Sequence, residues 1–201
     1  RVIAVRKAVG SEIDILVDAN TNYTLQDIRK VMPSFDEAGV SWLEEPFPPQ
    51  DRKAYGLART LGRVPFAAGE NHYTRYEFAT LLDDGDVQFI QPDLSKAGGV
   101  TESLRIAAMA SAYKLTINPH TSATAINMGN TIHFLSAIDN PGYFEGDVTS
   151  LNPFRDEMMD KLAYQLDKDG CVTPYDGIGI GMKINLDFIK AHPLIDGPCY
   201  I

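Results

Sequence analysis

Cysteine is scarce and long apolar runs are missing, and each shortage excludes a class of protein. Only two cysteines, Cys171 and Cys199, occur among the 201 residues, far apart and without the spacing of a metal site. We therefore expect free thiols in a reducing cytoplasm rather than a disulfide framework. No run of about 18 apolar residues is present to span a membrane. The N-terminal residues also lack the pattern of a secretory signal peptide, so a cytoplasmic location and no membrane partner are expected.

Basic residues are outnumbered by acidic ones. The chain has 18 lysines and arginines against 27 aspartates and glutamates, which gives a formal net charge of −9. Nucleic-acid binders need a basic face to contact phosphates, so no nucleic-acid partner is expected. Apolar residues make up 44% and charged residues 22% of the chain, which are ordinary proportions for a globular protein.

Two hydrophobic periodicities alternate along the chain. Runs rich in branched residues are typical of buried strands: Ile13–Val17, Ser41–Leu43, Phe66–Ala68, Val87–Ile90, Leu115–Ile117 and Tyr143–Phe144. Amphipathic stretches of helix length lie between them: Thr24–Ala38, Arg52–Leu61, Arg75–Leu82, Val100–Tyr113 and Ala123–Ala137. Thr24 with Asp27 indicates a helix start, and Gly39 a helix end. Such alternation predicts an α/β fold with a parallel sheet, either a barrel or a doubly wound sheet.

The alternation stops after about Asn152, so the chain divides into two predicted parts. Residues 1–152 are expected to form a partial β/α barrel with about six strands. Residues 153–201 form a turn-rich tail that contains four prolines: Pro153, Pro174, Pro193 and Pro198.

Three carboxylates follow the first three predicted strands at equal spacing. Asp18, Glu44 and Glu70 are separated by 44 − 18 = 26 and 70 − 44 = 26 residues. Equal spacing in a repeating β/α architecture places equivalent residues at the C-terminal mouth of the strands, where barrel enzymes keep their active sites. Converging carboxylates repel one another unless a hard cation lies between them, which favours Mg²⁺, with Mn²⁺ or Ca²⁺ as alternatives. Any one of these acids alone is more typical of a solvated loop residue or a helix cap, so the prediction depends on all three at equal spacing.

The next two strands end near a carboxylate and an imidazole. Asp93 follows the fourth strand in Gln91-Pro-Asp93, and His120 follows the fifth in Asn118-Pro-His120. A carboxylate bonded to one ring nitrogen fixes the tautomer and leaves the other nitrogen as a base. We therefore predict that Asp93 and His120 act together, although a lone histidine is often only structural.

Further polar residues surround this predicted mouth. Glu145 lies 145 − 120 = 25 residues after His120 and could donate a hydrogen bond to a substrate oxygen when protonated. Lys96 could neutralise the acidic mouth or bind a substrate carboxylate, and His72 could line the pocket. A plain surface acid and a solvated lysine remain open alternatives for Glu145 and Lys96.

Taken together, these motifs resemble the enolase superfamily in its mandelate racemase and muconate lactonizing enzyme family, within the mandelate racemase group. The resemblance rests on Val17-Asp-Ala-Asn20, Leu43-Glu-Glu-Pro46, Gly69-Glu-Asn71, Gln91-Pro-Asp93 with Gly98-Gly99, and Asn118-Pro-His120. It implies that Asp18, Glu44 and Glu70 bind Mg²⁺, with Mn²⁺ as the alternative. It also implies that Asp93 and His120 form the general-base dyad and that Glu145 holds the substrate carboxylate or its enolate. Our candidate substrate-binding residues are Asn20, Lys96 and His72.

The resemblance also implies an architecture. The family folds as a (β/α)7β barrel of the TIM type behind an N-terminal capping domain, and its second strand often carries a Lys-x-Lys base. This sequence begins after both features, so we expect an incomplete barrel that lacks its first strands and the capping domain. The tail 153–201 is expected to pack back toward such a domain, and the protein is expected to form a homo-oligomer.

The implied activity is removal of the proton α to a carboxylate, which gives an enolate intermediate. Dehydration of a sugar acid to a 2-keto-3-deoxy acid, a lyase reaction, is the favoured outcome. A racemase or epimerase, or a cycloisomerase of a hydroxy acid or lactone, would share the first half-reaction. A non-catalytic barrel fragment that only binds ligands is the third alternative. In each enzymatic case the partner is a small-molecule carboxylate.

Overall fold

In the computed structural model of the chain, residues 1–121 and 124–197 are described, and they form two compact units. The first unit comprises Arg1–His120 together with Ile138–Glu145. The second unit comprises Thr121–Ala137 and the described residues from Gly146 onward. Three features singled out from the sequence lie outside the described residues: the helix start at Ala123, Pro198 and Cys199.

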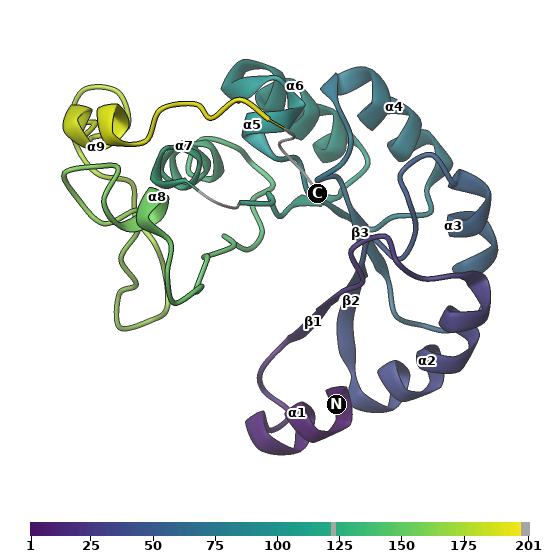
Figure 1. Cartoon of the computed structure of the whole chain (residues 1–201). Coiled ribbons are helices and arrows are strands. Elements are labelled where there is room, and N and C mark those ends of the chain that lie inside the picture. Colours follow the sequence, from purple (N-terminus) through teal and green to yellow (C-terminus); the bar gives the residue numbers. More distant parts are fainter. Residues whose placement is uncertain (122–123, 198–201) are drawn as a thin grey trace. The chain divides into compact units, whose positions relative to one another are not determined.

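The first unit alternates strands with helices, as the sequence predicts. Its elements follow the order α1 (Val2–Val9), β1 (Ile15–Asp18), α2 (Leu25–Ala38), β2 (Val40–Glu44), α3 (Arg52–Ala58), β3 (Phe66–Ala68), α4 (Thr74–Asp84), β4 (Phe89–Ile90), α5 (Leu94–Ala97), α6 (Gly99–Ala112) and β5 (Thr116–Ile117). Helices α2, α3, α4 and α6 follow one another along one side of the strands (Figure 1). The expected β/α repeat is therefore confirmed for this unit.

Five strands form a single sheet over the described residues, in the order β1-β2-β3-β4-β5, and every neighbouring pair is parallel. Asp18 stands opposite Glu44, Ala68 opposite Ile90, and Ile90 opposite Ile117. Because parallel strands end at the same edge, the residues that follow each strand gather at one side of the sheet. This edge carries the polar side chains that the sequence singles out.

Apolar burial explains why the sheet and its helices hold together. The strand residues Leu43, Ala67, Ala68, Ile90 and Ile117 are fully buried, as continuous apolar strands in a covered parallel sheet should be. Buried helix residues complete this core: Ile28, Met32, Phe35, Phe78, Leu82 and Ile106. Removal of this apolar surface from water, at roughly 25 cal/mol per Å², is the main stabilising contribution.

Helix α2 begins and ends where the sequence predicts. The Thr24 hydroxyl accepts from the Asp27 backbone N–H at 3.2 Å, and the Asp27 carboxylate accepts from the Thr24 backbone N–H at 2.9 Å. This capping box satisfies donors that have no partner inside the helix. Gly39 ends the helix in the left-handed conformation, with φ 61°. The capped helix fixes the connection between β1 and β2, and therefore the spacing of Asp18 and Glu44.

The sixth strand, predicted at Tyr143–Phe144, is wrong. The chain pairs with β5 only through an isolated bridge between Ile117 and Pro141, where the Gly142 N–H donates to the Ile117 carbonyl at 2.8 Å. Proline has no N–H, so the ladder cannot use Pro141 as a donor. The next N–H, of Tyr143, donates instead to the Asn118 side chain at 2.8 Å. Side-chain bonding thus replaces the strand pairing that the apolar pair Tyr143–Phe144 suggested.

The second unit contains α7 (Ala125–Leu135), α8 (Pro153–Asp156), α9 (Leu186–Ala191) and many turns. Its core includes Met128, Ile132, Met158, Met182 and Phe188. An antiparallel bridge joins Met159 to Ile184. In neither unit is a described helix both long enough and apolar enough to cross a membrane.

Candidate active site

The candidate site lies at the C-terminal edge of the sheet in the first unit. Asp18 and Glu44 are the last residues of β1 and β2 and are register partners. Glu70 comes two residues after β3 ends, and Asp93 and His120 come three residues after β4 and β5. All five side chains therefore lie at or just after the C-terminal ends of successive strands, at the same edge of the sheet.

Asp93 and His120 form the pair that the sequence predicts. Asp93 Oδ2 lies 2.8 Å from His120 Nδ1, and the Asp93 side chain is almost completely buried. The other oxygen, Oδ1, accepts from the Ser95 backbone N–H at 2.7 Å and from the Ser95 hydroxyl at 2.6 Å. Burial alone would raise the pKa of Asp93, but the bonds from His120 and Ser95 outweigh it and lower the pKa. The carboxylate is thus ionised and fixed in orientation beside the imidazole.

The second ring nitrogen of His120 faces Glu70. His120 Nε2 lies 3.6 Å from Glu70 Oε1, so one imidazole links two carboxylates through its two nitrogens. Burial would lower the pKa of His120, but the hydrogen bond to Asp93 and the charges of Glu70 and Glu145 outweigh it and raise the pKa. With Nδ1 held by Asp93, Nε2 is the atom that can exchange a proton with a substrate.

Lys96 contacts the same oxygen of Glu70. Lys96 Nζ lies 2.7 Å from Glu70 Oε1, from its place on the short helix α5. Burial would lower the pKa of Lys96, but the bond and the charge of Glu70 raise it above the usual value. The lysine is therefore cationic and neutralises part of the acidic edge, which is one of the two roles considered from the sequence.

Asp18 and Glu44 complete the acidic group. Asn20 donates to Asp18 through its backbone N–H and its side-chain amide, each at 2.7 Å. Partial desolvation and the negative charge of Glu70 nevertheless raise the pKa of Asp18. Burial raises the pKa of Glu44 to about 7, with added repulsion from Asp18 and Glu145, against a bond from Gln91. The indole N–H of Trp42 also donates to Glu44, at 3.2 Å.

Whether these acids fit a cation is a question of donor chemistry. Over residues 1–121 and 124–197, no three His, Cys, Asp or Glu side chains are close enough together to form a ready-made site. Asp18, Glu44 and Glu70 nonetheless act on one another electrostatically, since Glu70 raises the pKa of Asp18 and Asp18 raises that of Glu44. Mutually repelling carboxylate oxygens are the donor set that a hard divalent cation neutralises. The three carboxylates are therefore chemically suited to such an ion, and their joint coordination of a single cation stays a prediction.

The remaining candidates divide between the site and its surroundings. Glu145 is close enough for its charge to raise the pKa of both Glu44 and His120, so it lies near the acidic edge. Asn20 is occupied with Asp18 and thereby orients that carboxylate. His72 is buried, and its described ring contact is with Phe78, at 5.8 Å between centroids.

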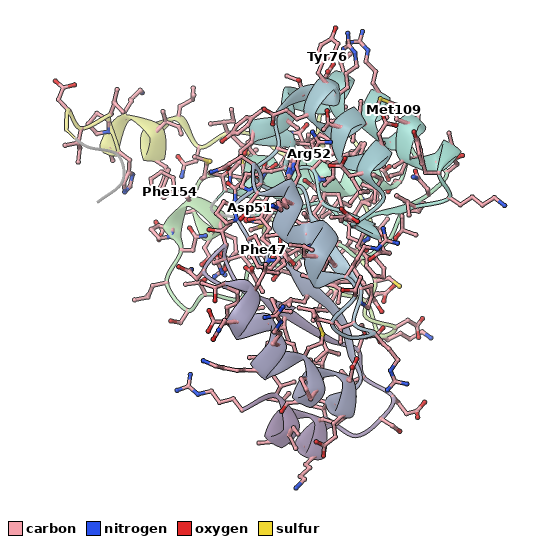
Figure 2. The ribbon with its side chains drawn as sticks, turned by 90° about the vertical axis from the view of Figure 1, so that its right-hand side faces the viewer. Phe47, Asp51, Arg52, Tyr76, Met109 and Phe154 are labelled. Atoms are coloured by element: carbon pink, nitrogen blue, oxygen red, sulfur yellow. The ribbon has the colours of Figure 1, made fainter. Side chains whose placement is uncertain are left out.

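His72 lines a separate cavity of about 360 Å³ between α3 and α4. Apolar and aromatic side chains form much of its wall, including Tyr55, Leu81 and Val87. The Arg52–Asp84 ion pair joins the two helices beside it, and Figure 2 labels Asp51 and Arg52 at the start of α3. Burial lowers the pKa of His72, so this imidazole is neutral at pH 7. The described side-chain contacts of His72 are thus with Phe78 and this cavity rather than with the acidic edge.

Glu45 and Asn71 form a hydrogen-bonded pair beside the site, and the sequence alone predicts no role for either residue. Glu45 directly follows Glu44, and both of its carboxylate oxygens accept hydrogen bonds from Asn71. Burial raises the pKa of Glu45, with the Asn71 side-chain bond opposing. Both residues stand inside quoted motifs, Leu43-Glu-Glu-Pro46 and Gly69-Glu-Asn71. The only indication in the sequence is the pair of adjacent glutamates, Glu44 and Glu45, and it does not show that Asn71 is the partner of Glu45.

Comparison with known proteins connects this geometry to a family. A family model described as enolase C-terminal domain-like matches residues 1–188. The crystal structure of a member of the enolase superfamily from Polaromonas sp. JS666 is 51% identical and superposes with a TM-score of 0.95, covering 100% of this chain and 53% of that one. Further matching structures are named as mandelate racemase/muconate lactonizing enzyme or as like it.

Two curated relatives have named activities. D-galactarolactone cycloisomerase from Agrobacterium fabrum is 32% identical over 97% of this chain and 53% of its own length. D-galactonate dehydratase from Xanthomonas campestris pv. campestris is 29% identical over 94% of this chain and 50% of its own length. The chain therefore spans about half the length of these curated relatives. Because the family model covers nearly the whole chain, this protein belongs to the enolase superfamily, as a portion of the C-terminal α/β barrel of its mandelate racemase and muconate lactonizing members.

Proposed function

We propose that this chain supplies the cation-binding and general-base residues of an enzyme that removes the proton α to a carboxylate. The favoured overall reaction is Mg²⁺-dependent dehydration of a sugar acid to a 2-keto-3-deoxy acid. The observation that carries the proposal is the position of His120, with Nδ1 at 2.8 Å from Asp93 and Nε2 at 3.6 Å from Glu70. A base held by one carboxylate and facing another is arranged to act on a substrate bound over the acidic edge.

The cation would be held by Asp18, Glu44 and Glu70, whose oxygens suit Mg²⁺, with Mn²⁺ as the alternative. The chemistry that a bound Mg²⁺ supplies is neutralisation of the charge that develops on the substrate carboxylate when the α-proton leaves. Lys96, at 2.7 Å from Glu70, adds a second positive charge at the same edge. Asn20 fixes the orientation of Asp18 through two bonds of 2.7 Å.

His120 would perform the proton transfers. Its Nε2 accepts the α-proton while Nδ1–H continues to donate to Asp93, so the imidazolium forms beside a carboxylate. The C–H electron pair remains on the substrate as an enolate. Return of the proton from Nε2 to the hydroxyl on the neighbouring carbon releases water and leaves an enol, which tautomerises to the 2-keto acid. Glu145 would hydrogen-bond the substrate oxygen that gains charge.

Two relatives support two outcomes of the same first step. The dehydratase from Xanthomonas supports loss of water, and the cycloisomerase from Agrobacterium supports rearrangement of a lactone. The slightly higher identity of the cycloisomerase, 32% against 29%, keeps that reaction as the second candidate. Mass spectrometry of the products separates them, because dehydration removes one water and cycloisomerisation leaves the mass unchanged.

The test is a screen of sugar acids and their lactones in D₂O with Mg²⁺. We expect deuterium exchange at the α-carbon and formation of a 2-keto acid from at least one substrate. His120→Asn should lose both activities by roughly 10²- to 10⁴-fold, whereas Asp83→Asn, at an exposed bond to Tyr113, should retain them. Full exchange by His120→Asn with every substrate turned over would contradict the assigned base.

A non-catalytic barrel fragment is the alternative from another class. Titration with Mg²⁺ in a calorimeter separates it from both enzymes, because both proposed reactions need the cation at the acidic edge. We expect saturable binding that Glu44→Gln abolishes. Absence of binding by the unaltered protein would favour the non-catalytic alternative.

A further inference from the structure

Glu45 stands where the backbone leaves β2 in an unusual conformation. It directly follows Glu44 and is only 2% exposed. Its φ is +35°, in the left-handed region that residues with a Cβ rarely occupy. A strained, buried, ionisable residue persists only where surrounding contacts hold it, and such residues cluster at functional sites. The contacts of Glu45 therefore decide what this conformation is for.

The backbone of Glu45 connects its neighbours on both sides. Its N–H donates to the Ala67 carbonyl in β3 at 3.0 Å. Its carbonyl accepts from the N–H of Thr21, in the loop after β1, at 2.8 Å. Glu45, which directly follows β2 and Glu44, is thus hydrogen-bonded on one side to the loop after Asp18 and on the other to the strand that precedes Glu70.

The side chain makes a second connection to the loop after β3. Glu45 Oε1 accepts from the Asn71 backbone N–H at 3.3 Å, and Oε2 accepts from the Asn71 side-chain amide at 2.6 Å. Asn71 immediately follows Glu70, so this two-point contact fixes the peptide that leaves Glu70. Both oxygens are directed at Asn71, which makes Glu45 a holder of the loop rather than a member of the cation-binding group.

We propose that Glu45 is a positioning residue that sets the direction of the Glu70 carboxylate through its paired hydrogen bonds to Asn71. This inference rests on the proposed function, because the orientation of Glu70 matters there for cation binding and for the approach of His120. Partners outside the ligand group commonly control affinity, and their loss typically costs about 10- to 100-fold in metal binding. We expect the two hydrogen bonds of Glu45 to Asn71, rather than its negative charge, to be responsible for this role.

Geometry and charge are separated by two substitutions at position 45. Glu45→Met keeps the length of the side chain but removes both acceptors. Glu45→Gln removes the charge yet can keep both bonds, because its oxygen accepts from the Asn71 backbone and its amide donates to Asn71 after that side chain rotates. We expect Mg²⁺ affinity, measured by calorimetry, to fall roughly 10- to 100-fold in Glu45→Met and to stay within about threefold in Glu45→Gln.

Asn71→Ala tests the same contact from the other side. It deletes the side-chain amide and leaves the backbone donor, so it should weaken Mg²⁺ binding in the same direction as Glu45→Met. The double variant should be no weaker than Glu45→Met alone, since both changes remove one interaction. Glu37→Met, an exposed glutamate on α2, is the matched control and should bind as the unaltered protein does. If Glu45→Met does not fold, Asn71→Ala and Glu45→Gln still decide the proposal.

Three results would overturn it: unchanged affinity in Glu45→Met or Asn71→Ala, equal loss in Glu45→Gln and Glu45→Met, or simple addition of the two single effects. Amide hydrogen exchange of residues 69–73, measured without Mg²⁺, separates this proposal from the proposed function. Exchange that is faster in Glu45→Met than in the unaltered protein, but unchanged in Glu45→Gln, supports the positioning role even if the protein binds no Mg²⁺. Unchanged exchange refutes it.

Discussion

His120 Nδ1 lies 2.8 Å from Asp93 Oδ2, across the ends of the neighbouring strands β5 and β4. The opposite oxygen of Asp93 is already occupied by two donors of Ser95. The carboxylate therefore cannot turn away from the imidazole without breaking those bonds. This arrangement assigns the Nδ1 proton to the side of Asp93 and leaves Nε2 available as a base.

Asp93→Asn should reverse that assignment. Ser95 presents two donors, so the oxygen of the introduced amide will face Ser95 and its nitrogen will donate to His120 Nδ1. The histidine proton then moves to Nε2, which can no longer act as a base. We expect kcat to fall by roughly 10²- to 10⁴-fold with the fold intact. Asp83→Asn is the control of equal chemistry, and a kcat near that of the unaltered protein in Asp93→Asn would contradict the dyad.

Lys96→Met should affect the stability of the Mg²⁺-free protein and the affinity for Mg²⁺ differently. Without Mg²⁺, it removes the cation at 2.7 Å from Glu70 and leaves the acidic group uncompensated. We expect a loss of about 1–2 kcal/mol in unfolding free energy in EDTA. Because Lys96 no longer competes for Glu70, Mg²⁺ affinity should stay equal or increase. Lys53→Met, an exposed lysine on α3, should change neither; weaker Mg²⁺ binding by Lys96→Met would show that the lysine does not compete with the cation.

Gly69→Ala should damage both stability and the site. Gly69 has φ +150°, and a Cβ there would stand 2.6–2.7 Å from the backbone of Gln91. The next residue is Glu70, so relief of this clash displaces a proposed cation ligand. We expect a loss of about 2–4 kcal/mol in denaturant unfolding. Gly85 also has a positive φ, +66°, but a Cβ there would meet nothing within 4 Å. Gly85→Ala should therefore cost only about 1 kcal/mol, and equal losses in the two variants would remove the argument from close packing.

Asp147→Ala should destabilise the second unit. Asp147 accepts from the Thr149 backbone and hydroxyl at 2.8 and 2.5 Å, and from the Asn152 amide at 2.6 Å. Loss of these bonds should cost about 1–3 kcal/mol. Asp169→Ala, in an exposed turn, is the control. A thermal unfolding midpoint unchanged by Asp147→Ala would contradict the assigned role.

The contribution of Asp147 should also depend on pH. The bonds from Thr149, then Asn152, lower the pKa of Asp147 below its ordinary value of 3.8. A lowered folded-state pKa means that the stabilisation is complete above the ordinary value and is lost as pH falls through the folded-state value. The difference between the unaltered protein and Asp147→Ala should therefore shrink between about pH 6 and about pH 3 in urea unfolding.

The sequence predicts the sheet well because strand burial leaves a direct hydrophobic signal. Phe66–Ala68 is predicted without error, and the helix limits Thr24 and Gly39 agree with the observed caps. The His120–Asp93 contact also follows from the positions of two strand ends. Each of these features depends on a local pattern of apolar and polar residues.

Other contacts depend on loop conformation and could not be predicted. Positive φ values at Asn20 and Glu45 direct the chain after β1 and β2. Asparagine often adopts this conformation, but glutamate rarely does, so the residue type gives no indication of it at Glu45. The two conformations bring Asn20 onto Asp18 and Glu45 onto Asn71. Likewise, the apolar pair Tyr143–Phe144 looks like a strand, although Pro141 and Asn118 determine the actual pairing. Side-chain direction after a strand end is thus the information that periodicity does not contain.

The strand order β1-β2-β3-β4-β5 has a consequence for biosynthesis. Each strand pairs with the one made just before it, so every new β/α unit can dock as soon as it leaves the ribosome. Among the strands of the described residues, each finds its partner in the preceding strand, so the loop entropy of each docking step stays small. The nascent chain can therefore place the polar residues that follow these five strands one at a time, from Asp18 to His120.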